Sequence, residues 1–340
     1  MNVLPFSVPK LGLTIDSRAV GLARIARARS LCRGMALQSY DTREVPSGAV
    51  VVSHADPNIK DAAVVVSQVR SLVGARAAGV GPSAVSLTVH GLCARIALFE
   101  FERFPEKHPE REAIVSWRFQ KDFQAPIANA RLAYRVFATP AENGKQSVRV
   151  LAGLIQLPII EQYESVCEEA GLIPTSLGLS FFRIFDLCRL MIAGHAANAE
   201  EVFFVYFEDD SFSFFALHRS VPVFVRVKNL RETPEGPGQS GAAAVANEVR
   251  ATLQFYDDRI RRQPWRGGEA ARPVFVFNGS VALGEPFGGP AAILEIGTAA
   301  SLGIHEISLA PEGILRSRLI SAHAPVSGKG LIALSGVLAA

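Results

Sequence analysis

The chain has 340 residues, which is long enough for one large domain or two ordinary ones. Apolar residues make up 49% of it and charged residues 20%, and this composition excludes extended disorder. The net charge is +3 and the basic residues are scattered along the chain, so the sequence predicts no nucleic-acid partner.

The cysteines and the N-terminal residues favour a cytoplasmic protein. The four cysteines (positions 32, 93, 167 and 188) are far apart and form no CxxC pair, which favours reduced thiols over disulfides or zinc ligands. The N-terminal segment MNVLPFSVPK lacks the basic start and apolar core of a secretory signal. Apolar runs such as Leu331–Ala340 reach about half of a bilayer span, so we expect no transmembrane helix.

The first part of the chain begins with three strand-like runs joined by tight turns. These runs are LGLTI, VGLARIA and the stretch around GMALQSYD, and their spacing predicts an antiparallel meander. Ile59–Leu72 then has apolar residues at helical spacing, and Ala84–Val89 is predicted to be a buried strand. The order is therefore strand, strand, strand, helix, strand.

The middle of the chain, about residues 90–170, departs from this order and is expected to be an inserted subdomain. Its predicted elements are a helix over Pro109–Lys121, strands over Leu132–Thr139 and Ser147–Leu157 with Asn-Gly in the turn between them, and a helix over Ile159–Ala170. A helical segment, Ser180–Ala197, leads into the second half.

The second half repeats the order of the first. The predicted elements are strands over Val202–Phe207, Phe212–Leu217 and Val221–Val227, a helix over Ala243–Arg261 and a strand from Val274. Two such copies, starting near residues 11 and 202, predict an α/β protein with the duplicated two-lobe architecture of the actin-like (ribonuclease-H-like) fold. We expect lobe 1 over residues 1–187, lobe 2 over residues 188–325, and a segment at residues 326–340 that packs back on the core.

Four segments resemble, in order, segments of the PilM family of type IV pilus assembly proteins: Glu112–Phe137, Val150–Pro174, Ala246–Arg259 and Val274–Gly288. FtsA and GspL are similar in fold. However, FtsA would be expected to end in an amphipathic membrane helix, and GKGLIALSGVLAA lacks the charged face of one. GspL would be expected to carry a transmembrane helix, so the PilM resemblance is preferred.

The resemblance implies a scaffold at the cytoplasmic face of the inner membrane, peripheral to the bilayer. Its partner would be the N-terminal cytoplasmic peptide of a PilN-like bitopic protein, and it would meet other pilus platform proteins. The groove for the peptide would lie between the first meander and the insertion at about residues 90–170. There an extended peptide would pair with an exposed strand.

A functional first phosphate loop in this family resembles Gly-Ile-Asp-Ile-Gly-Ser-Ser-Ser-Val-Lys. In this alignment Gly12 and the hydroxyl of Ser17 are kept, whereas Thr14 replaces the Asp, Asp16 replaces the second Gly and Gly21 replaces the Lys. Glycine lets backbone N–H groups approach phosphate oxygens, and the Asp organises magnesium through water. A carboxylate at position 16 would repel those oxygens by several kcal/mol at contact, with an effective dielectric constant of about 20.

A shifted register does not restore the loop. It would make Asp16 the magnesium-organising residue but would place Arg18 where a glycine is needed. The second loop, around Glu208-Asp209-Asp210, contains no glycine, and acidic residues in a turn are more often solvated than metal-bound. We therefore predict no metal site and no catalytic residue.

If nucleotide binding were retained, the sequence would place it on residues from both halves of the chain. The candidates are Asp16, Ser17, Arg18, Glu248, Asn278, Gly279 and Ser280.

Two hypotheses of different classes follow. The first is a pseudo-ATPase scaffold that needs no cofactor, and the alternative is an active actin-fold ATPase or small-molecule kinase that binds ATP–Mg. The altered loops favour the scaffold.

Overall fold

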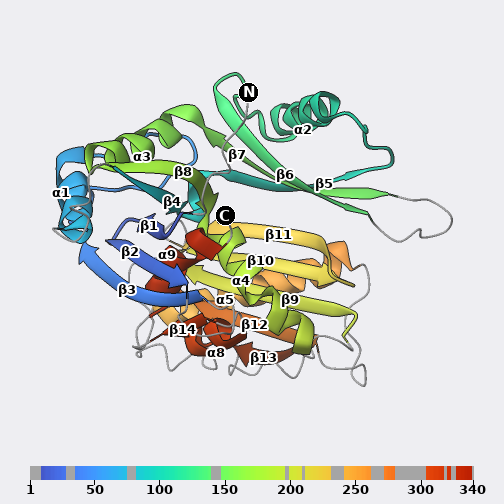
Figure 1. Ribbon diagram of the computed structural model, residues 1–340. Helices are drawn as coiled ribbons and strands as arrows, with labels where there is room; N and C mark the ends of the chain where they lie inside the picture. Colours follow the sequence, from blue (N-terminus) through green and yellow to red (C-terminus); the bar gives the residue numbers. More distant parts are fainter. Residues whose placement is uncertain are drawn as a thin grey trace. The chain divides into compact units, whose positions relative to one another are not determined.

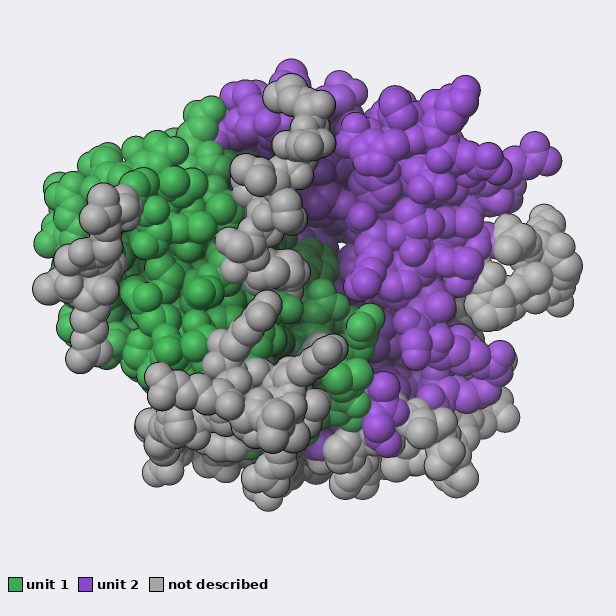
Figure 2. Space-filling view, in the orientation of Figure 1, with its two compact units in different colours: residues 1–93, 158–191, 310–340 green, residues 94–157, 192–309 purple. Residues whose placement is uncertain are grey.

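The structure is a computed structural model. It describes residues 9–27, 35–74, 82–138, 147–195, 199–208, 211–230, 241–261, 272–279, 304–317, 320–322 and 327–338. The chain divides into two compact units (Figure 2). Unit 1 comprises residues 1–93, 158–191 and 310–340, and unit 2 comprises residues 94–157 and 192–309.

Unit 1 is built around a six-stranded sheet in the order β14-β3-β2-β1-β4-β8 (Figure 1). The strands are β1 (Leu11–Ile15), β2 (Ala19–Arg27), β3 (Met35–Glu44), β4 (Ser83–Val89), β8 (Leu172–Leu179) and β14 (Ile320–Ala322). The α-helices are α1 (Ala62–Val73), α3 (Leu157–Glu169), α4 (Ser180–His195), α8 (Pro311–Ser317) and α9 (Gly328–Leu338), with a short 3₁₀ helix η2 (Gly91–Cys93).

The two faces of strands β1 and β4 differ in polarity. On one face the strands carry buried aliphatic residues: Leu11, Leu13, Ile15, Val85, Leu87 and Val89. On the other face the parallel register pairs Gly12 with Ser86 and Thr14 with Thr88. Helix α9 covers this second face and packs against β1, β2 and β4. The apolar helix α9 thus covers the face of the sheet that carries small residues and hydroxyl groups.

Unit 2 holds two sheets. A five-stranded sheet has the order β11-β10-β9-β12-β13, and a three-stranded sheet has the order β5-β7-β6. Its strands are β5 (Arg95–Phe101), β6 (Ala130–Ala138), β7 (Val148–Gln156), β9 (Glu201–Glu208), β10 (Ser211–His218), β11 (Val221–Asn229), β12 (Arg272–Asn278) and β13 (Ile304–Ser308). Its helices are α2 (His108–Phe123), α5 (Gly241–Phe255) and a π-helical turn η4 (Tyr256–Ile260).

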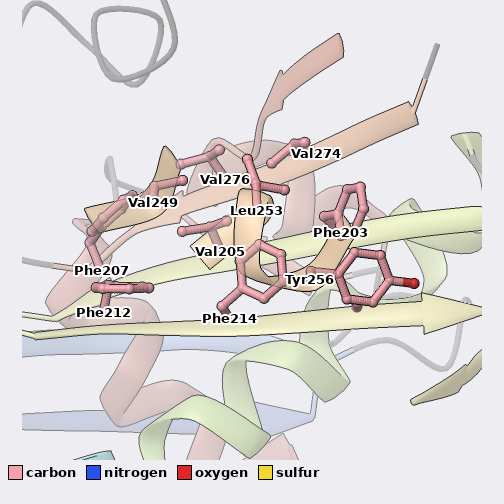
Figure 3. Packing of buried hydrophobic residues seen from close by; sticks show 11 residues of the cluster. Phe203, Val205, Phe207, Phe212, Phe214, Val249, Leu253, Tyr256, Val274 and Val276 are labelled. Carbon is pink, nitrogen blue, oxygen red and sulfur yellow. The ribbon is translucent and has the colours of Figure 1, made fainter. Parts of the chain in front are cut away.

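The core of the five-stranded sheet is aromatic (Figure 3). Phe203 and Phe214 from neighbouring strands have ring centroids 5.5 Å apart, and Phe203 also packs against Tyr256, with centroids 5.3 Å apart and ring planes at 83°. Val249 and Leu253 on α5 complete this cluster. Edge-to-face contacts of this kind add to the stabilisation from buried apolar area.

The same five-element pattern occurs in both units. In unit 1, β1, β2, β3, α1 and β4 give the strand order β3-β2-β1-β4, and in unit 2, β9, β10, β11, α5 and β12 give β11-β10-β9-β12. In each unit the first of these strands along the chain (β1 or β9) pairs antiparallel with the next strand (β2 or β10). It pairs parallel with the strand that follows the helix (β4 or β12). The repeat predicted from the sequence is therefore confirmed.

Several details differ from the sequence expectations. Strands β5, β8, β13 and β14 and helices α8 and α9 were not predicted. Strand β8 contains Pro174, which has no N–H to donate, but β8 lies at the edge of its sheet among the described strands and tolerates it. The helix expected from Ile59 begins at Ala62, because the Asp61 side chain accepts the Val64 N–H and caps it.

No helix in the described ranges is long and apolar enough to cross a bilayer.

Candidate functional site

The turn between β1 and β2 is closed by the side chain of Asp16. Its Oδ1 accepts the backbone N–H groups of Arg18 and Ala19, both at 2.9 Å, and its own N–H donates to the Ala19 carbonyl at 3.0 Å. This is the hairpin that a phosphate loop would occupy, and its backbone donors bind a carboxylate of the chain itself.

The second oxygen of this carboxylate contacts the other end of the chain. Lys329 Nζ, in the first turn of α9, donates to Asp16 Oδ2 at 2.7 Å. The two side chains are only 1% and 2% exposed. Burial alone raises the pKa of Asp16, but the Lys329 ammonium and the two N–H groups outweigh it, so this pKa lies below its usual range. Asp16 is therefore a buried, ionised and fully paired carboxylate.

The remaining expected loop residues lie around this pair. Ser17 is half-buried and Arg18 is exposed at the tip of the turn. Gly21 lies beneath Tyr40, because a Cβ there would be 3.1 Å from Thr14 Cγ2 and 3.3 Å from Tyr40 Oη. Burial raises the pKa of Tyr40, so this phenol is neutral. The glycine that replaces the family's lysine thus makes room for a tyrosine.

The second hairpin, between β9 and β10, contains the acidic turn. Glu208 is buried, and its carbonyl accepts the Ser211 hydroxyl at 2.9 Å. Asp209 and Asp210 lie outside the described residues. Within the described ranges, no group of three or more His, Cys, Asp or Glu side chains is arranged to hold a metal ion.

The expected adenosine-side residues lie in unit 2. Glu248 on α5 forms an ion pair with Lys228 on β11, and both side chains are mostly buried. Asn278 is half-buried at the end of β12, and the Gly279 N–H donates to the Phe207 carbonyl at 2.9 Å. Ser280 lies outside the described residues. Glu248 and the Gly279 N–H therefore both have partners within unit 2.

Sequence reasoning missed two cations in unit 1. Lys329 is the one charged residue of the otherwise apolar helix α9, and this isolation was the only indication in the sequence that it has a buried partner. Arg183 on α4 donates from Nη1 to Thr88 Oγ1 at 2.6 Å and from Nη2 to Ser176 Oγ at 3.4 Å. Burial lowers the pKa of Arg183 to about 10, so the guanidinium is charged at neutral pH and joins α4 to strands β4 and β8.

The three-stranded sheet of unit 2 presents a second candidate surface. One face packs on α2 through a cluster that includes Phe99, Val115 and Phe119. Strand β6 is an edge, paired only with β7 among the described strands. Along β6, Arg131 and Val136 are exposed, and 38% of the surface of Val136 is accessible to solvent. An edge strand with exposed apolar and basic side chains can pair with an extended segment.

Comparison with known proteins identifies the fold. No protein-family model matches the sequence, and no curated protein matches it. Among solved structures, a chain of the PilM-PilN type IV pilus biogenesis complex superposes with a TM-score of 0.69, at 17% identity, over 98% of each chain. The chain has a PilM-like, actin-like fold.

Two further structures match less closely. A Bacteroides thetaiotaomicron protein with an actin-like ATPase fold and unknown function matches with a TM-score of 0.48 and 7% identity, over 94% of this chain and 99% of that chain. The cytoplasmic domain of EpsL, an inner-membrane component of the type II secretion system of Vibrio cholerae, matches with a TM-score of 0.43 and 8% identity. The match covers 96% of this chain and 94% of that chain.

Proposed function

We propose that this PilM-like protein is a scaffold of a type IV pilus or related secretion platform. It would act at the cytoplasmic face of the inner membrane and bind the N-terminal cytoplasmic peptide of a PilN-like bitopic protein. The observation that carries the proposal is the fold match over 98% of both chains to a component of a complex named for PilM and PilN. Other platform proteins are its expected neighbours.

The geometry of the first hairpin supports a binding role over an enzymatic one. Phosphate loops depend on free backbone N–H groups at the turn. Here the N–H groups of Arg18 and Ala19 both donate to Asp16. The proposed protein is accordingly a pseudo-ATPase without a required cofactor.

Strand β6 is the proposed peptide-binding edge. Backbone pairing would supply affinity and the exposed side chains of β6 would supply selectivity. Val136 is the apolar side chain most suited to contact the peptide, since it is exposed near the C-terminal end of a strand whose outer edge has no partner among the described strands.

A peptide titration tests the proposal. A labelled synthetic peptide with the cytoplasmic tail sequence of the PilN-like partner should bind the wild-type protein, and Val136→Asp should weaken it about tenfold or more by placing a charge in an apolar contact. Trp117→Ala is the matched control, because Trp117 is an exposed apolar residue of α2 in the same unit. Absence of binding to the wild type would overturn the proposed function.

A further inference from the structure

The β1–β2 hairpin and the first turn of α9 form a pocket of donors around one carboxylate. Asp16 receives the Arg18 and Ala19 N–H groups at Oδ1 and the Lys329 ammonium at Oδ2, at 2.7 to 2.9 Å. Two backbone donors from a turn and one ammonium make up the set that proteins use to bind phosphate oxygens.

We infer that this donor set is a phosphate-type oxyanion site that the chain fills with its own side chain, Asp16. The inference rests on the proposed function, because it explains how the nucleotide position became closed. It adds that the hairpin and α9 together hold a set of anion-binding donors, the Arg18 and Ala19 N–H groups and Lys329, and that Asp16 supplies the anion they bind.

Burial explains why the occupant must be negative. The Lys329 side chain is 2% exposed and its charge is balanced by Asp16. A buried ammonium that loses its carboxylate is strongly destabilising, so an external anion that takes the same place should restore stability. The N-terminus of α9 adds a favourable potential for negative charge at the same point.

Truncating the side chain should therefore create a phosphate site. In Asp16→Ala, the two backbone N–H groups and Lys329 remain, and the carboxylate volume is vacated. In Asp16→Asn, the amide still fills that volume and its oxygen can still accept the N–H groups. Both variants lose the buried negative charge, but only the alanine variant also removes the atoms that contact the three donors.

The test is thermal unfolding of the full chain in inorganic phosphate, against sodium chloride at equal ionic strength. Saturating phosphate should raise the midpoint of Asp16→Ala by roughly 5 °C, and leave the wild type and Asp16→Asn at their chloride values. The double variant Asp16→Ala/Lys329→Met should lose the phosphate-specific gain.

Two outcomes would overturn the inference. One is an alanine variant that phosphate stabilises no more than chloride does, and the other is an equal gain in Asp16→Asn. If Asp16→Ala does not fold in chloride, its refolding yield with and without phosphate is scored instead, and equal yields count as the first of these outcomes. Failure here leaves the peptide-binding proposal untouched, since the wild-type peptide titration decides that separately.

Discussion

Gly12 and Ala333 lie in backbone contact across the interface between β1 and α9. A Cβ on Gly12 would be 2.0 Å from the Ala333 carbonyl oxygen and 2.8 Å from Val337 Cγ2. Real Cβ atoms do not approach backbone oxygens this closely, so glycine is required there by space rather than by φ. In a phosphate loop this glycine would let the backbone approach the phosphate. Here Gly12 lets helix α9 pack directly on strand β1.

Gly12→Ala should therefore destabilise the protein by about 3 kcal/mol or more, because helix α9 would have to move away from the sheet. Denaturant unfolding measures the change. Gly194→Ala is the control: it lies in α4 with no atom within 4 Å of an added Cβ. It should stabilise the helix by about 0.5 to 1 kcal/mol. A Gly12→Ala protein of wild-type stability would contradict the contact.

The Asp16–Lys329 pair predicts a pH-dependent contribution to stability. The folded pKa of Asp16 is lowered from its usual 3.8, so the stabilisation is complete above that value and is lost as the pH falls through the lower folded pKa. Asp16→Asn should cost about 3 kcal/mol at pH 7, and its difference from the wild type should shrink below pH 3.8.

Urea unfolding at several pH values measures this difference. Glu161→Gln, an exposed acid on α3 of the same unit, should show no such dependence. If the cost of Asp16→Asn stays constant from neutral to strongly acidic pH, the pair is not stabilising through its charge.

The buried ion pair between Arg272 and Asp257 should contribute more to the stability of the folded protein than the exposed pair between Glu200 and Arg219. Arg272 donates to both Asp257 oxygens at 2.6 and 2.9 Å, and both side chains are nearly completely buried. Asp257→Asn should cost about 3 kcal/mol, since it removes the hydrogen-bonded carboxylate and leaves the buried guanidinium only the Glu201 carboxylate, 3.6 Å away.

The Glu200–Arg219 pair gives the comparison, because it has a similar 2.7 Å contact but side chains that are 69% and 59% exposed. Glu200→Gln should leave stability almost unchanged, since solvent screens such pairs. Thermal unfolding of both variants measures the contrast, and equal losses would refute the role assigned to burial.

Adding ATP and magnesium should leave the wild-type melting midpoint unchanged at millimolar concentration. Asp16 blocks the donors of the first hairpin, and Glu248 is paired with Lys228. A ligand at 100 times its Kd would stabilise the folded state by about 2.7 kcal/mol, so at millimolar ATP a Kd of roughly 10 μM gives a clear rise. A clear rise with ATP–Mg would support the active ATPase or kinase instead.

Local patterns predicted most of the repeated elements. The alternation in Leu11–Ile15 and the helical spacing after Ile59 correspond to β1 and α1 within a few residues. Strand β8 was hidden because Pro174 and Gly178 interrupt its pattern. Its position at the edge of the sheet, among the described strands, makes Pro174 acceptable, and Gly178 leaves space for the Arg183 side chain. Sequence position alone does not reveal which strand becomes an edge.

For the β1–β2 hairpin, the sequence pointed to Asp16 but not to Lys329, with which Asp16 is paired. Asp16 was recognised as incompatible with a phosphate loop, but its partner lies 313 positions away. No local pattern connects Lys329 to that turn, because the pairing depends on α9 covering β1. The sequence therefore predicted an altered loop, and the fold adds that Asp16 is paired with Lys329 there.

The placement of α9 also has a consequence for biosynthesis. Residues 328–338, which cover strand β1, leave the ribosome more than 300 residues after it. Until then the Asp16 carboxylate has no cation, and the small-residue face of the sheet stays open to water. Unit 1 is thus completed only after the residues of unit 2 have been synthesised, and the nascent chain is exposed to aggregation and proteolysis throughout that interval.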